Sequence, residues 1–172
     1  MLSFDIRSLE HKAAEVDDDL PASDSVWEEA DGRPDGTLHV IGRLLAVGAN
    51  RFYFSGSFDG LLATTCRRCL TAVKAPVAED AHFFYAEAGA DEADDPEVYL
   101  IDSRDAQLDI RPAIREQWLL AVPAWILCRP DCQGLCLQCG ADRNTTDCGH
   151  RAESTTDSRW DALKTLKGPQ DS

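Results

Sequence analysis

The 172-residue sequence has no apolar run approaching the length of about 20 residues that a membrane-spanning helix needs. Its first seven residues also lack the apolar core of a secretory signal peptide. These two absences argue against a membrane or secreted protein, and they predict a cytoplasmic location.

The usual sequence marks of an enzyme are missing as well. There is no glycine-rich phosphate-binding loop and no nucleophile elbow. The four histidines are scattered, and no two of them have the spacing of a metalloprotease site: His11, His39, His82 and His150. The sequence therefore predicts a non-enzymatic protein without a small-molecule substrate.

Basic residues are scarce, with 17 Lys and Arg against 31 Asp and Glu, which gives a net charge of -14. The acidic excess lies in residues 1–36 and residues 87–109, each with a net charge of -8. After a short strand near residues 2–6, the run Asp17-Asp18-Asp19 predicts a solvated loop. A chain of this charge is a poor candidate for wrapping a nucleic-acid backbone, although residues 37–86, at +2, could contact RNA locally.

Cysteine is plentiful by comparison, and an odd number of seven in a cytoplasmic protein favours metal binding over a disulfide framework. Four thiols fall within one short, turn-rich run: Cys128, Cys132, Cys136 and Cys139. Zinc takes four soft ligands at about 2.3 Å in a tetrahedron, and this run could supply all of them. We therefore predict that these four thiols bind one Zn2+ ion.

A second C-x-x-C pair, Cys66 and Cys69, lies between two predicted strands. It could be half of a zinc site, a redox-active dithiol or two incidental thiols. Redox dithiols usually lie at the N-terminus of a helix, whereas a strand follows here, so the zinc half-site is favoured. An alternative zinc site would then join this pair to Cys136 and Cys139.

The number of thiols limits how many sites are possible. Two all-cysteine sites would need eight thiols and the chain has seven, so a second site would need a histidine such as His150. A histidine in a polar loop is more often solvent-exposed than a ligand. The sequence does not decide whether His150 or the nearby Cys148 contributes.

Residues 37–85 alternate apolar and polar side chains, which predicts three antiparallel strands at about residues 37–47, 52–62 and 73–85. The turn Gly48-Ala49-Asn50 would join the first two strands, and Gly56 would mark a bulge or bend. A short strand is also expected at residues 98–101. One face of this meander should be buried.

A helix is predicted to follow the sheet. Asp109 would cap it, Pro123 would end it, and Ile110, Ile114 and Trp118 would form its apolar stripe. A second helix is expected at residues 157–166. The predicted fold is α+β: an antiparallel β-meander packed by a helix, with a C-terminal zinc-binding cysteine cluster and a terminal helix. Its parts are an acidic segment 1–36, a core 37–127 and a cysteine-rich segment 128–172.

The order of these motifs resembles the YceD family, the large ribosomal RNA subunit accumulation proteins. The resemblance covers roughly residues 37–168 and is most specific at Cys66-Arg67-Arg68-Cys69-Leu70 and at residues 132–140. The helix motif I-R-P-x-I-R-E and the tail motif R-W-x-x-L-x-x-L also match. Residues 157–160 and 141–144 depart from the family pattern, and neither departure affects a thiol.

The resemblance implies a role in 23S ribosomal RNA accumulation and assembly of the large ribosomal subunit, with no known catalytic activity. The implied partner is a large-subunit precursor, through its RNA, its proteins or both. Candidate contacts are the basic residues beside the two thiol groups: Arg67, Arg68, Lys74, Arg129 and Arg143. These residues could instead offset the charge of a zinc tetrathiolate. The alternatives are a C-x-x-C redox protein and an acidic adaptor that binds basic ribosomal proteins.

Overall fold

The structure is a computed structural model that describes residues 2–88, 98–102 and 104–150. The helix expected at residues 157–166 lies outside the described residues. In chain order the elements are β1 (Ser3–Asp5), α1 (Ile6–His11), β2 (Ala14–Pro21), β3 (Thr37–Gly48), β4 (Arg51–Thr65), β5 (Ala72–Glu87), β6 (Val98–Ile101), β7 (Gln107–Asp109) and α2 (Arg111–Ala121).

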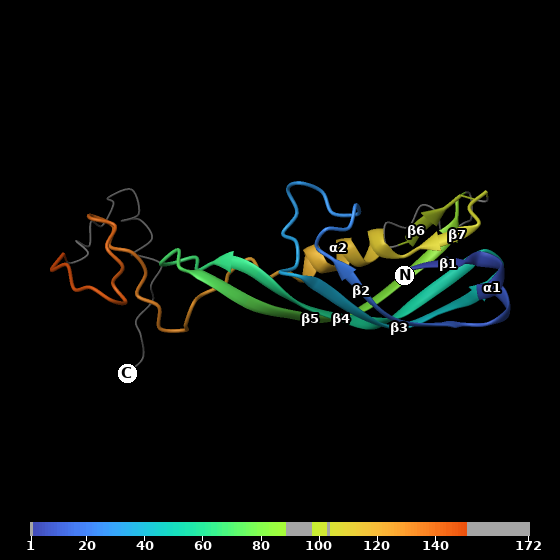
Figure 1. Cartoon of the computed structure of the whole chain (residues 1–172), viewed down its shortest axis with the longest axis horizontal. Coiled ribbons are helices and arrows are strands. Elements are labelled where there is room, and N and C mark those ends of the chain that lie inside the picture. The colour runs from blue at the N-terminus through green and yellow to red at the C-terminus, as the bar shows by residue number, and fades with distance from the viewer. Residues whose placement is uncertain (1, 89–97, 103, 151–172) are drawn as a thin grey trace, which may run out of the picture.

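A five-stranded mixed sheet is the centre of the fold, with strand order β2-β3-β4-β5-β6 (Figure 1). Neighbouring strands are antiparallel except β5 and β6, which are parallel. The predicted meander of β3, β4 and β5 is confirmed, as are its tight turn and the short strand β6. The fold is nevertheless richer in β-structure than expected, because β2 extends the sheet and β1 pairs with β7.

The alternation of apolar residues along the meander places its large side chains on one face, where α2 packs. Ile110, Ile114 and Trp118 are completely buried, as the helical spacing predicts. The Trp118 indole donates a 2.7 Å hydrogen bond to the carbonyl of Gly32, so its polar atom is satisfied. The predicted cap at Asp109 is wrong by one residue: the N-cap is Ile110, which makes no side-chain cap.

Two predictions about the strands are wrong. Asp17 and its neighbours are part of β2, because Val16 and Leu20 alternate with the acids and are buried in the core. Gly56 lies directly opposite Gly42 with no bulge there. A Cβ added at Gly56 would lie only 2.1 Å from a backbone oxygen of β3, so glycine is needed for close approach rather than for a bend.

The loop between β2 and β3 is held against α2 by ion pairs. Arg111 reaches Asp24 at 3.3 Å, and Arg115 reaches Asp31 at 2.6 Å. Both arginines belong to the helix motif of the family resemblance, and here they fix the position of a loop.

The β4–β5 hairpin extends beyond the rest of the sheet, and its tip meets the chain that follows α2 (Figure 1). Residues 66–71 and 127–150 form this end of the molecule, which we call the cysteine lobe. The remaining described residues form the body. No described helix is long and apolar enough to cross a membrane.

Candidate metal centres

The first cysteine cluster consists of Cys66, Cys69, Cys128 and Cys132, whose sulfur atoms all lie within 4.8 Å of one another. The sulfurs of Cys66 and Cys132 are 3.7 Å apart, and those of Cys69 and Cys128 are 3.6 Å apart. Two thiolates on a tetrahedral zinc ion with 2.3 Å bonds are separated by about 3.8 Å. The first cluster therefore has the dimensions of a metal site.

The tip of the β4–β5 hairpin supplies half of the first cluster. The amide of Cys66 donates to the carbonyl of Thr71, and the amide of Leu70 donates to the carbonyl of Cys66. Leu70 has a φ of 61°, in the left-handed region that favours glycine. This tight turn directs both thiols of the C-x-x-C pair to the same side.

The segment after α2 supplies the other half of the first cluster. The amide of Arg67 donates to the carbonyl of Ile126, and the Arg68 guanidinium donates to the carbonyl of Cys132 at 2.9 Å. The Asn144 side-chain amide lies 3.4 Å from the Cys132 sulfur. The cluster thus joins two segments that are about 60 residues apart in the sequence.

The second cluster consists of Cys136, Cys139, Cys148 and His150, whose ligand atoms also lie within 4.8 Å of one another. The sulfur of Cys136 is 3.8 Å from Nδ1 of His150. A sulfur and a nitrogen on one tetrahedral zinc ion would be about 3.6 Å apart. All four ligands come from one short stretch of chain, so this cluster closes a local loop.

The two C-x-x-C pairs have the same turn geometry. In the second pair the amide of Gly140 donates to the carbonyl of Cys136, whose own amide donates to the carbonyl of Ala141. Gly140 has a φ of 71° and corresponds to Leu70 of the first pair. The repeated turn indicates that both pairs are built to direct two thiols toward one point.

The clusters differ in burial. In the first cluster Cys66, Cys69 and Cys132 are buried, and Val73, Leu127 and Leu135 pack against them. In the second cluster Cys136 alone is buried, whereas Cys139 and His150 are exposed. An ion in the first cluster would therefore be shielded from water and one in the second would be more accessible.

The thiols of each cluster differ in pKa, so they do not ionise equally. Burial alone would raise the pKa of Cys66, but the amides of Cys69, Arg68 and Cys128 outweigh it and lower the pKa to about 6. Burial and the neighbouring thiols raise the pKa of Cys128 to about 12. Four thiolates so close repel one another unless a bound cation offsets their charge.

In the second cluster, the amides of Cys139 and Gln138 lower the pKa of Cys136 to about 6. The pKa of Cys148 is raised: the amide of His150 acts to lower it, but the Cys136 thiol and burial together outweigh that effect. One thiolate again suppresses its neighbour, so this donor set also fits a cation.

The structure groups the thiols differently from both sequence predictions. It does not bring Cys128 and Cys132 together with Cys136 and Cys139, and it does not join the latter pair to the C-x-x-C of the hairpin. Gly134, with a φ of 71°, turns the chain between the two clusters. The ligand count was the sequence signal for two sites, because seven cysteines and His150 make two sets of four, but it does not tell which thiols belong together.

The basic residues beside the thiols have different environments. Lys74 pairs with Asp35 of the body, and Arg129 pairs with Asp131 at 3.3 Å. Arg67 and Arg143 are exposed, and neither side chain has a hydrogen-bond or ion-pair partner among the described residues. Two of the five predicted contact residues are therefore engaged in ion pairs within the chain.

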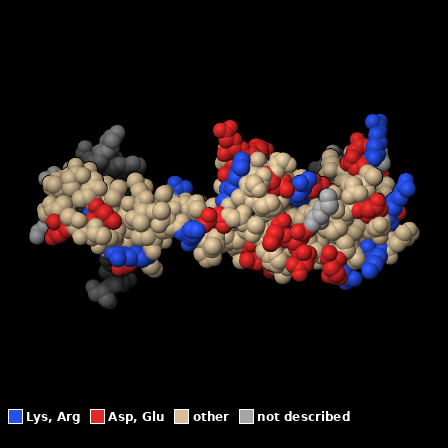
Figure 2. Space-filling view, in the orientation of Figure 1, with Lys and Arg blue, Asp and Glu red and all other residues tan. Residues whose placement is uncertain are grey.

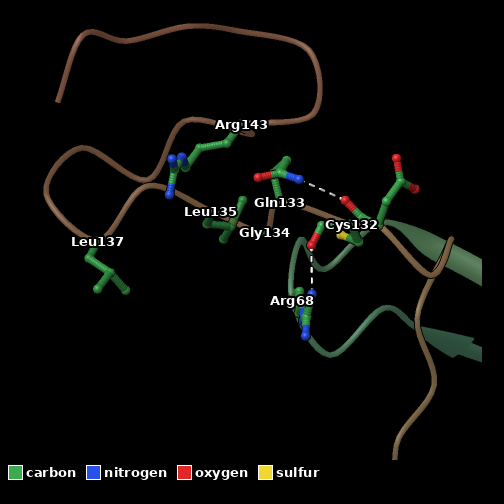
Figure 3. Close-up of a pocket in the computed structure, with 8 residues that line it drawn as sticks. Arg68, Cys132, Gln133, Gly134, Leu135, Leu137 and Arg143 are labelled. Carbon is green, nitrogen blue, oxygen red and sulfur yellow. Dashed lines mark hydrogen bonds between the residues drawn. The ribbon is translucent and has the colours of Figure 1, made fainter. Parts of the chain in front are cut away.

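A shallow pocket of about 440 Å³ lies at the junction of the hairpin tip and the later segment. Arg68 comes from the hairpin, whereas Arg143, Gln133 and Leu137 come from the later segment (Figure 3). The Leu137 side chain is 97% exposed. The pocket thus combines two guanidinium groups with the Asp131 carboxylate, one side-chain amide and an exposed apolar side chain.

Comparison with known protein families identifies the family to which the chain is related. The family model described as "Large ribosomal RNA subunit accumulation protein YceD" matches residues 54–167, which is well over half of the sequence and includes both clusters. The chain belongs to the YceD family. The resemblance found from the motifs is thereby confirmed.

Individual relatives have partial similarity to this YceD-family chain. Uncharacterized protein Rv2926c of Mycobacterium tuberculosis and uncharacterized protein Mb2951c of Mycobacterium bovis are each 36% identical over 108 residues, which is 61% of this chain and 50% of the relative. The chain thus spans about half the length of these curated relatives. The Zea mays protein named "Large ribosomal RNA subunit accumulation protein YCED homolog 1, chloroplastic" is 45% identical over 42 residues, 24% of this chain and 14% of the relative. No solved structure matches significantly.

Proposed function

We propose that this protein is a non-enzymatic ribosome biogenesis factor of the cytoplasm, needed for 23S ribosomal RNA accumulation and assembly of the large ribosomal subunit. The observation that carries the proposal is the YceD family match across residues 54–167, because the family is described by large ribosomal RNA subunit accumulation. The maize relative bears the same description in its name.

The proposed role of the two clusters is to hold structural zinc. Seven thiolates and one imidazole are soft or intermediate donors, which favour zinc over magnesium or calcium. Each cluster offers four protein ligands, so a tetrahedral ion would have no open position for water or substrate. Zinc would therefore fix the shape of the lobe rather than activate a reactant.

The cysteine lobe is the proposed docking surface for the precursor, through Arg67, Arg68 and Arg143. Arg67 and Arg143 are exposed and have no partner among the described side chains, so they are available for phosphate groups. Arg68 also lines the pocket but donates to the carbonyl of Cys132, so it has a structural role as well. This makes Arg67 and Arg143 the cleaner residues to test.

A redox function of Cys66 and Cys69 is less well supported. A catalytic thiol must be accessible, and Cys66 is completely buried against Cys132. Zinc binding with these thiols unreactive to alkylation would exclude this alternative.

Deletion of the gene tests the proposed function directly. We expect 23S ribosomal RNA and large subunits to fall relative to small subunits. A deletion strain with a normal ratio of 23S to 16S ribosomal RNA would contradict the proposal.

Charge reversal tests the docking surface. The double variant Arg67→Glu/Arg143→Glu should lose co-sedimentation with large-subunit precursors and keep its zinc content. The matched control Arg7→Glu/Lys12→Glu makes the same change in charge at the other end of the molecule, and it should co-sediment normally. If both variants behave alike, the lobe is not the docking surface.

A further inference from the structure

The sheet has one face covered by α2 and the β1–β7 pair, and a second face that we call the outer face (Figure 1). Residue pairing places four side chains in one row across the outer face, from β3 to β6: Leu45, Tyr53, Phe84 and Val98. Tyr53 and Phe84 stack with their ring centroids 4.5 Å apart. The row is apolar along its whole length.

The apolar row and its surroundings are accessible to solvent. Phe84 is 48% exposed and Leu100 of β6, in the next row, is 54% exposed, whereas Leu45, Tyr53 and Val98 are partly buried. Ile41 of β3 is 44% exposed and lies two rows away. Single exposed apolar side chains are ordinary, whereas a contiguous group on a sheet face is typical of an interaction site.

Acidic side chains occupy rows further along the outer face: Asp17 and Asp80 lie two rows from the apolar row, and Asp19 and Asp59 lie three rows from it. The carboxylates of the outer face are Glu15, Asp17, Asp19, Asp59 and Asp80. Among the basic residues of this face, Arg43 pairs with Glu15 at 3.4 Å and His39 lies 3.1 Å from Asp19. His82 and Arg51 lie in the two rows directly beside the apolar row. Asp59 and Asp80 are exposed and have no side-chain partner among the described residues.

The outer face and the cysteine lobe differ in their surface charge. Figure 2 shows acidic side chains gathered over the body, including the region where β2 runs, while the cysteine lobe presents mostly uncharged surface. A nucleic-acid backbone would be repelled by the carboxylates of the outer face. A second copy of the chain would set the same carboxylates against one another, which disfavours self-association through this face.

We propose that the outer face binds an extended, lysine- or arginine-rich protein segment that carries apolar side chains. The apolar row would receive the apolar side chains, and Asp80 and Asp59, two and three rows further along the face, would pair with the cations. The proposal rests on the proposed function in one respect, because a large-subunit precursor would be the source of this basic segment.

The spacing of the outer face suits an extended peptide. Successive outward residues of one strand, such as Tyr53, Ser55, Ser57 and Asp59, are two positions apart. Alternate residues of an extended chain are about 6.6 Å apart, and so are the rows of the sheet. A peptide lying along β4 would therefore present its side chains in step with the rows.

A binding assay with the zinc-loaded full chain tests the proposal. The probe is a fluorescent peptide with the repeat Leu-Ser-Leu-Ser-Lys-Ser, which places leucine and lysine on the same face of the extended chain, and its binding is followed by anisotropy. Asp59→Asn/Asp80→Asn should weaken binding about fivefold, since two exposed ion pairs together contribute on the order of 1 kcal/mol. Phe84→Ser should weaken it about tenfold or more by removing the apolar anchor. Added salt should weaken binding to the wild type.

Matched controls test whether binding is specific to the outer face or results from overall negative charge or nonspecific apolar contacts. Glu10→Gln/Glu29→Gln removes two exposed carboxylates elsewhere, and Leu120→Ser removes a leucine of α2 that is 73% exposed. Both control variants should bind the peptide like the wild type. Circular dichroism should show all variants folded.

Several results would overturn the proposal. The peptide could fail to bind the wild type, or bind the outer-face and control variants equally. Single-stranded RNA could compete for the same face, or Phe84→Ser could convert a dimer to a monomer in sedimentation, which would assign the face to another occupant. Normal 23S ribosomal RNA in the deletion strain would refute the proposed function and leave the peptide result unaffected, so the two failures are distinguishable.

Discussion

The body and the cysteine lobe are stabilised by different means. The body has a continuous core of aromatic and aliphatic side chains, including Phe52, Phe54, Phe58 and Trp118. In the lobe the buried side chains are cysteines. The apolar side chains that pack on them, Leu127 and Leu135 of the lobe and Val73 of β5, are only partly buried. Small units with so few buried apolar side chains depend on metals or cross-links. The comparison indicates that the body can fold by burial alone, whereas the lobe needs its ions.

Within the lobe, the two clusters also have different structural roles. The first joins the β4–β5 hairpin to the chain after α2, and the second closes a loop within residues 136–150. The amide of Leu135 donates to the carbonyl of Arg68, so the second loop is attached to the first cluster. Loss of the first ion should therefore affect the whole lobe, and loss of the second should affect only the local loop.

The largest effect is expected from Cys66→Ser. Structural zinc contributes on the order of 10 kcal/mol to the folding of small modules, so the lobe should unfold while the body stays folded. Hydrogen exchange should show lost amide protection in residues 127–150 and normal protection in β3 and β5. The companion variant Cys136→Ser should lose protection only in residues 136–150. If either variant unfolds the body, the division near residue 127 is wrong.

The reciprocal change is Trp118→Ala in the body. Removing a completely buried tryptophan should lower the free energy of unfolding by about 3–5 kcal/mol, with the zinc content of the folded protein unchanged. Urea denaturation followed by fluorescence and zinc analysis would measure both. The control Trp125→Ala removes a side chain that is 64% exposed and should change stability little. Zinc loss in folded Trp118→Ala protein would show that the two regions are coupled.

A smaller effect within the body is expected from Arg115→Ala. The hydrogen bond from Arg115 holds the pKa of Asp31 below its usual value. A carboxylate with a lowered pKa stabilises the folded state above its unfolded pKa of about 4, and this contribution is lost as the pH falls. The variant should therefore have a lower urea midpoint than the wild type at pH 7, and the difference should shrink toward pH 3. A difference independent of pH would contradict this role for the ion pair.

The smallest expected effect is an increase in the stability of the first cluster, from Leu70→Gly in the lobe. Leu70 has the positive φ that Gly140 has in the equivalent turn, and glycine adopts it without strain. The change should stabilise the first cluster by up to about 1 kcal/mol, seen as slower zinc loss to a chelator. The reverse change, Gly140→Leu, should speed loss from the second cluster. If Leu70→Gly and Gly140→Leu both lose zinc at the same rates as the wild type, the turn does not limit zinc release.

The sequence predicts the meander and α2 well because their signals are local. Alternation along β4 and the spacing of Ile114 and Trp118 reflect one buried face, and the structure has that face. The acidic run of β2 was misread because charge hid the alternation of Val16 and Leu20. Charged side chains on the solvent face of a strand are compatible with a sheet, so charge alone does not indicate a loop.

The presence of the cysteine clusters is predictable from spacing, whereas the grouping of their ligands is not. Adjacent thiols in the sequence suggested one site at Cys128, Cys132, Cys136 and Cys139. The structure instead assigns Cys132 and Cys136 to different clusters, because the hairpin tip supplies two thiols from far away in the chain. That contact depends on the length and direction of β4 and β5, which local spacing does not report.

The central claim is that the lobe contains two separate zinc sites. Native mass spectrometry of the purified chain, made in zinc-replete cells, measures the number of ions directly. Two zinc ions are expected in the wild type and one in Cys136→Ser, whereas Cys66→Ser, in which the whole lobe unfolds, should bind none. A wild type that binds one ion or none, or a Cys136→Ser variant that loses all zinc, would contradict the claim.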